Sequence, residues 1–164
     1  MKKIASAGAL LLIVLLAAGV IARPGLGADP ATLKVVGSGG GPGQATLTLD
    51  DLRRLGATEL RTATSWTQGT QIFVGVTGAR LVQELRAQGR EVVAEAVNGY
   101  RIVIPFDVFA AETTIIAYSR NGQPMTVREK GPLWVVFPFD ADAKFRSDRY
   151  KSYAIWSLIS VEFR

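Results

Sequence analysis

The chain has 164 residues, of which 48% are hydrophobic, enough for a domain held together by its own core. It contains no cysteine and no histidine, and its 19 basic and 14 acidic residues give a formal net charge of +5. The two missing residue types exclude disulfides, thiolate or imidazole metal sites, and nucleophilic catalysis of the Ser-His-Asp or Cys-His kind.

The first 28 residues have the pattern of a secretory signal peptide. Met1 to Lys3 is basic, Ile4 to Ala22 is apolar, and Leu26-Gly27-Ala28 offers a cleavage site. We expect cleavage and a periplasmic or secreted protein; the alternative is an uncleaved membrane anchor, for which the apolar stretch is long enough. Cleavage would leave 16 basic and 14 acidic residues, a net charge of +2. So small an excess provides no basic face for nucleic acid.

Residues 29–46 are expected to form a flexible segment ahead of a domain that occupies 47–164. Gly39 to Gly43 is rich in glycine and separates two short apolar stretches, Leu33 to Val36 and Thr46 to Leu49. A glycine-rich loop can bind phosphate, but the lysine and hydroxyl residue of such loops do not follow at the required spacing. We therefore predict a tether or an edge turn.

The rest of the chain alternates short predicted strands with few helices. Strands are predicted over 59–66, 72–76, 91–96, 100–104, 114–118, 133–138 and 158–163, and helices over 51–55, 78–88 and 105–109. Asn98-Gly99 and Asn121-Gly122 predict hairpin turns, because both residue types tolerate positive φ. Gly131-Pro132 ends a charged loop, Arg128 to Lys130, that follows the second hairpin. Short strands without long helices indicate a single α+β domain, mostly β.

Five short motifs support a resemblance to a known family. They are Asn98-Gly99-Tyr100, Ile104-Pro105, Arg128 to Trp134, Pro138, and Ile155 to Leu158. With these motifs the chain resembles, from about Leu47 to the C-terminus, the molybdopterin-binding domain of the sulfite oxidase family, and in particular its short, exported, stand-alone bacterial members. The resemblance implies a single sulfite-oxidase-like domain and molybdopterin, the molybdenum cofactor, as its ligand.

The chain departs from that family at the metal ligand. In the family, a cysteine that binds molybdenum lies at about the end of the predicted strand 59–66, where this chain offers only Thr64, Ser65 and Thr67. A hydroxyl is a hard, weakly acidic ligand and cannot replace a thiolate in tuning a redox metal. We therefore expect the fold to be retained and conventional molybdenum redox catalysis to be altered or lost, and we assign no catalytic or metal-binding residue.

Six residues are candidates for binding a pterin-type cofactor or another small anion: Thr64, Trp66, Asn98, Tyr100, Arg128 and Lys130. The resemblance places Asn98 and Tyr100 near the pocket, whereas the residues alone predict Asn98 to be a turn residue with positive φ. Arg128 and Lys130 would hold an anion well between two apolar strands. The alternative is a solvated loop in which Glu129 neutralises one of them. For Trp66 the alternative is a core position at the end of a strand.

Two functions follow from these expectations. The first is an exported member of the molybdopterin oxidoreductase family that binds a pterin-type or other anionic ligand. The second is a non-catalytic periplasmic module that binds a small solute or acts as a sensor, together with a membrane-bound signalling or redox partner. The resemblance also implies that basic residues near Lys144 to Lys151 approach the pterin phosphate; the alternative for this segment is a solvated loop.

Overall fold

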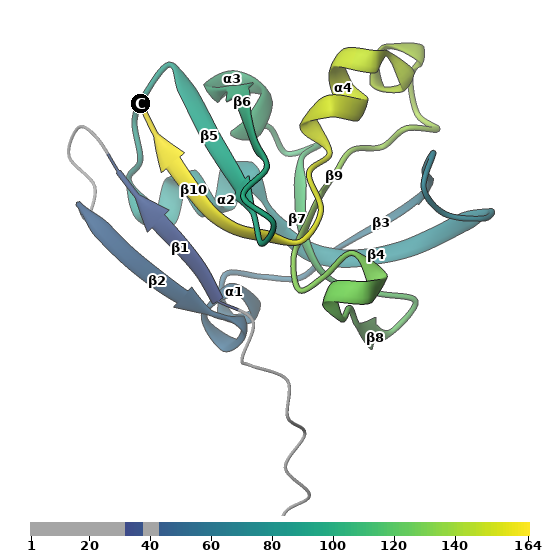
Figure 1. Ribbon diagram of the computed structural model, residues 1–164, viewed down its shortest axis with the longest axis horizontal. Helices are drawn as coiled ribbons and strands as arrows, with labels where there is room; N and C mark the ends of the chain where they lie inside the picture. The colour runs from purple at the N-terminus through teal and green to yellow at the C-terminus, as the bar shows by residue number, and fades with distance from the viewer. Residues whose placement is uncertain (1–31, 38–42) are drawn as a thin grey trace, which may run out of the picture.

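The structure is a computed structural model that describes residues 32–37 and 43–164 (Figure 1). The predicted signal peptide and its cleavage site lie outside these residues, as does the stretch 38–42 of the glycine-rich connector. Within the described ranges, no helix is long and apolar enough to cross a membrane.

The first of two sheets has the strand order β2-β1-β10-β5-β6. Its strands are β1 (Thr32–Val36), β2 (Gln44–Thr48), β5 (Glu91–Ala96), β6 (Arg101–Pro105) and β10 (Leu158–Phe163). Strand β1 pairs in parallel with β10 and antiparallel with β2. Leu33 and Val35, on either side of the exposed Lys34, are buried in the core. The described residues before Leu47 thus belong to the domain's sheet and not to the flexible segment expected over 29–46.

The second sheet has the order β3-β4-β7-β8, and β9 also pairs with β7. Its strands are β3 (Thr58–Ala63), β4 (Thr70–Thr77), β7 (Ile115–Arg120), β8 (Gln123–Pro124) and β9 (Trp134–Val136). The predicted hairpin at Asn121-Gly122 is confirmed, with φ values of 52° and 77°. The Asn121 side chain fixes the turn further, because its Oδ1 accepts from the backbone N–H of Ile72 at 2.9 Å.

The helices are short. They are α1 (Leu49–Arg54), α2 (Gly78–Leu85), α3 (Phe106–Phe109), α4 (Asp148–Tyr153) and two 3₁₀ turns, η1 (Val127–Glu129) and η2 (Ala143–Arg146). The hydroxyls of Thr48 and Thr77 accept from backbone N–H groups in the first turns of α1 and α2, as expected of helix caps. Helix α2 ends at Leu85, short of the predicted Gln88, because the next residue, Arg86, adopts the left-handed conformation with φ 48°.

One hydrophobic cluster joins the two sheets. It includes Leu33 and Val161 from the first sheet, Phe73 and Trp134 from the second, and Phe109 from α3. In Figure 1 the first sheet lies on the left, the second on the right, and α4 at the upper right, above β9. The predicted α+β, mostly β fold class is therefore confirmed, and α4 is placed beside the ends of strands from both sheets.

Candidate functional site

A cavity of about 380 Å³ opens between three segments that are far apart in the sequence. Its lining residues are Trp66 from the β3–β4 turn, Ala96, Asn98 and Tyr100 from the β5–β6 hairpin, and Lys151, Ser152, Ala154, Ile155 and Trp156 from α4 and the residues after it. Most of this lining is apolar or aromatic, which is typical of sites that bind small organic molecules.

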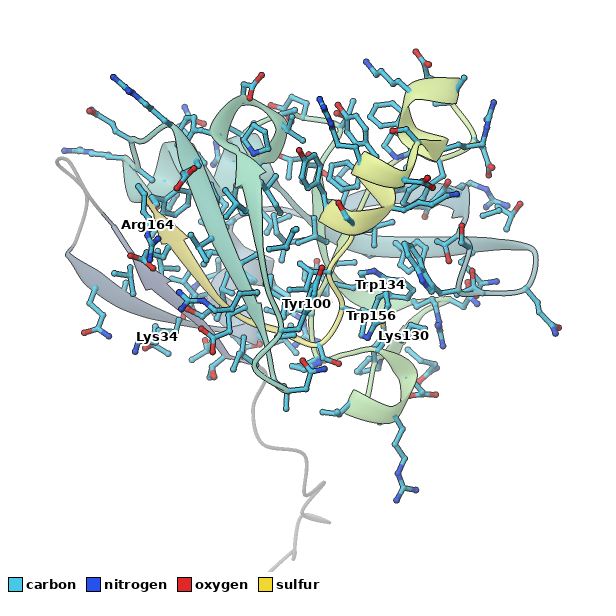
Figure 2. The ribbon with its side chains drawn as sticks, turned by 45° about the horizontal axis from the view of Figure 1, so that its top comes forward. Lys34, Tyr100, Lys130, Trp134, Trp156 and Arg164 are labelled. Carbon is cyan, nitrogen blue, oxygen red and sulfur yellow. The ribbon has the colours of Figure 1, made fainter. Side chains whose placement is uncertain are left out.

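The three tryptophans of the chain contact one another at this cavity. Their ring centroids are 6.1 Å apart for Trp66 and Trp134, 5.2 Å for Trp66 and Trp156, and 6.3 Å for Trp134 and Trp156, all in edge-to-face arrangements. Trp134 is fully buried, and its Nε1 donates to the carbonyl oxygen of Ala154 at 3.2 Å. Trp156 remains 36% exposed. The three tryptophans thus form an aromatic wall of the cavity. Trp134 anchors this wall in the core, and Trp156 is open to a ligand (Figure 2).

A second, smaller cavity of about 250 Å³ adjoins the first. Its lining residues are Ala63, Thr64, Ser65, Phe139, Asp140, Arg146 and Lys151, so Lys151 belongs to both cavities. The Lys151 ammonium lies 3.4 Å from the fully exposed carboxylate of Asp148. Such a solvated ion pair is weak, and the ammonium remains available to an anion in either cavity.

The structure brings three of the six predicted residues together. Trp66, Asn98 and Tyr100 line the larger cavity, and Thr64 lines the smaller one. The Thr64 hydroxyl accepts from the backbone N–H of Trp66 at 3.2 Å and so helps to fix the turn that presents this indole. The prediction of positive φ at Asn98 is wrong: Gly99 adopts it, at 80°, and the Asn98 side chain instead accepts from the backbone N–H of Tyr100.

Arg128 and Lys130 line neither cavity. Arg128 is exposed, whereas the Lys130 ammonium lies 4.5 Å from the centroid of the Trp156 ring. Glu129 neutralises neither of them, because its carboxylate accepts from the backbone N–H and the hydroxyl of Thr126, at 3.1 Å and 2.9 Å. In the described part of the chain, no salt bridge involves Arg128 or Lys130.

The Glu129 carboxylate should make the 126–130 loop sensitive to acid. The pKa of Glu129 lies below its usual value of 4.5, first because the Thr126 backbone N–H donates to it and then because the Thr126 hydroxyl does. A lowered folded-state pKa stabilises the protein above the usual value, and this contribution is lost as the pH falls through the lowered pKa. We expect Glu129→Gln to lower the urea midpoint at pH 7, and we expect the difference from wild type to shrink as the pH falls below 4.5 and through the lowered pKa of Glu129.

The matched control for this prediction is Glu112→Gln, which changes an exposed glutamate in the turn before β7. It should leave the urea midpoint close to that of wild type at both ends of the pH range. A Glu129→Gln deficit of the same size at pH 7 and pH 3 would contradict the role assigned to the ionised carboxylate.

The cavity residues contributed by α4 and the segment after it are not among the six predicted residues. Lys151 belongs to the basic segment that the resemblance implies to lie near the pterin phosphate, and Trp156 belongs to one of the motifs that carry the resemblance. A signal was present in Tyr150 and Tyr153, whose three-residue spacing places both rings on one side of a short helix. Tyr150 packs against Phe137 with ring centroids 5.1 Å apart, and this contact holds α4 against the core.

The two sheets and the short helices form one mostly β domain, and the aromatic cavity opens beside the ends of its strands. Among solved structures, the fold matches that of the sulfane dehydrogenase SoxCD from Paracoccus pantotrophus, with a TM-score of 0.59 and 17% sequence identity over 80% of this chain and 37% of that one. Among curated proteins, an uncharacterized oxidoreductase, YuiH of Bacillus subtilis, is 29% identical over 82 residues, which are 49% of this chain and 41% of the relative. No family model matches the chain. The chain spans less than half the length of either protein.

The larger cavity combines aromatic side chains with one positive charge. The two indoles and Tyr100 offer aromatic surfaces, and Lys151 offers a positive charge. The chain has no cysteine, and its described residues contain no group of three or more His, Cys, Asp or Glu that could hold a metal ion.

Proposed function

We propose that this chain is an exported domain of the molybdopterin oxidoreductase type, related to the sulfite oxidase family, that binds a planar anionic ligand of the pterin kind in the larger cavity. The observation that supports this most directly is the composition of the cavity wall. Trp66 and Trp156 provide the aromatic surface, and among the described residues that line the cavity Lys151 is the only charged one.

Each lining group has a role in this proposal. A flat heteroaromatic ring gains from packing against indole faces, and its polar edges have hydrogen-bonding partners in the side chains of Asn98 and Tyr100. The Lys151 ammonium pairs with the anionic group, and its place between the two cavities lets that group extend toward Thr64 and Ser65. The chain supplies no thiolate, so we derive no oxo-transfer step from these residues.

The missing thiolate also favours a second candidate function. A periplasmic module that binds a small solute or acts as a sensor, together with a membrane-bound signalling or redox partner, would use the same cavity without any metal. Molybdenum and pterin contents of the protein purified from its native periplasm distinguish the two. Pterin in near-stoichiometric amount supports the cofactor-binding function, and absence of both directs the search to other planar solutes.

Lys151→Met should weaken the binding of a planar anion. With pterin-6-carboxylate as the probe, we expect calorimetric titration to give a dissociation constant about tenfold higher than for wild type, because a contact to a charged group contributes roughly 1.5 kcal/mol when partly shielded from water. The control is Lys144→Met, since Lys144 lines neither cavity and its ammonium lies over the ring of Phe145. Equal binding by the Lys151 variant and wild type would reject Lys151 as the anion contact.

A further inference from the structure

Lys130 lies at the cavity wall but outside the cavity. Its ammonium is 4.5 Å from the ring centroid of Trp156, a residue that lines the cavity, whereas Lys130 itself does not. This distance is within the range of a cation–π interaction, and tryptophan is the best partner for one. Figure 2 shows the labelled side chains of Lys130, Trp156 and Trp134 gathered in one region, with Tyr100 nearby.

The backbone holds Lys130 in this place independently of its charge. Lys130 adopts the left-handed conformation, with φ 74°, at the end of η1, and its carbonyl oxygen accepts from the backbone N–H of Ser157 at 3.0 Å. Ser157 follows Trp156 directly, so the loop and the indole are joined by a main-chain hydrogen bond. The bonds from Thr126 to Glu129 close the same loop on its other side. The ammonium is thus presented to the ring by a fixed loop.

A cation held against an indole changes what the ring attracts. The face of an aromatic ring is electron-rich and by itself favours cations. A fixed ammonium offsets that negative potential and places a positive charge near the cavity. Partial exclusion of water there strengthens the attraction of this charge for an anion. In the described part of the chain no carboxylate pairs with Lys130 to cancel this charge.

We propose that Lys130 is a specificity-determining residue that acts through Trp156, so that the cavity selects negatively charged planar ligands over neutral ones of the same shape. Lys130 is a positioning residue in this account, since it touches the indole and not the ligand. The inference rests on the proposed function and deepens it by naming the charge that the site selects and the residue that selects it.

The test compares the binding of two probes with the same ring, pterin-6-carboxylate and 6-hydroxymethylpterin, to the protein as it is purified from its native host. The quantity measured is the ratio of their dissociation constants. Lys130→Met should reduce the preference for the anion about two- to fivefold, because a partly screened positive charge near the ligand's carboxylate contributes roughly 0.5–1 kcal/mol that the neutral probe does not gain. Lys130→Arg should retain the preference, because guanidinium also stacks on indole. Lys34→Met, on the exposed outer face of β1, controls for the loss of one unit of net charge.

If Lys130 had only a structural role, Lys130→Met would weaken the binding of both probes equally and leave the ratio of their dissociation constants unchanged. That result would overturn the inference, while the proposed function would stand. An unchanged ratio in Lys130→Gln would overturn it as well, and this second variant covers the case in which the methionine variant misfolds. If wild type binds neither probe, the proposed function and the inference both fail. Tryptophan emission gives an independent check, since loss of the ammonium should shift the spectrum of wild type but not that of a Trp156→Phe background.

Discussion

Trp134→Ala is expected to destabilise the protein by about 3–5 kcal/mol, the usual cost of removing a large aromatic side chain from a core. Trp134 has no exposed surface, and its ring lies 5.4 Å from that of Phe73 and 6.1 Å from that of Trp66, centroid to centroid. The substitution leaves a cavity and also removes the donor to the Ala154 carbonyl oxygen. Since domains are stable by only about 5–15 kcal/mol, the loss should be evident in urea unfolding followed by circular dichroism.

The control for this prediction is Trp134→Phe, which keeps an aromatic ring in the core and removes only the indole donor and part of the volume. It should cost clearly less than the alanine variant. If the two variants had the same free energy of unfolding, packing around the indole would not be the source of the stability, and the description of Trp134 as the anchor of the aromatic wall would be wrong.

Trp156→Ala should weaken the binding of the planar ligand. We expect the dissociation constant for pterin-6-carboxylate to rise between roughly 5-fold and 150-fold, because stacking of a flat ring on an aromatic side chain contributes about 1–3 kcal/mol. The free energy of unfolding should change less than in Trp134→Ala, since Trp156 is 36% exposed. Calorimetric titration and urea unfolding of the same preparation measure the two effects separately.

Val103→Ala provides the matched control, because Val103 is another exposed apolar residue, at 46%, and does not line either cavity. It should bind the probe as wild type does. Unchanged binding in Trp156→Ala would place the ligand elsewhere, and would remove the support for the proposed function that comes from the aromatic wall.

Strands and turns that depend on residues close together in the sequence were predicted correctly. The closing strand has the predicted bounds, Leu158–Phe163; beyond the irregularity between Leu158 and Ser160, the buried Val161 and Phe163 alternate with the less buried Glu162. The hairpin at Asn121-Gly122 follows from two residues that accept positive φ, and it forms without help from distant parts of the chain. The cap at Thr48 is equally local, because its hydrogen bond to the backbone N–H of Asp51 spans only three residues.

Features decided by distant contacts were not predicted. The cavity is assembled from the β3–β4 turn, the β5–β6 hairpin and α4, and no spacing in the sequence shows that these segments meet. Arg128 and Lys130 are adjacent to Glu129, but the Glu129 carboxylate is bound by Thr126 and the Lys130 ammonium lies over the ring of Trp156. Helix α4 was missed because its six residues are mostly polar and its position depends on the rings of Phe137 and Phe145.

The position of β10 has a consequence for the order in which the domain folds. Strands β1 and β2 form one local hairpin and β5 and β6 another, but only β10, the last strand along the chain, pairs with both β1 and β5. The first sheet therefore cannot close until residues more than a hundred positions apart have met. Contacts of such sequence separation slow folding, so the two hairpins should gain protection from hydrogen exchange early and the β1–β10 pairing late.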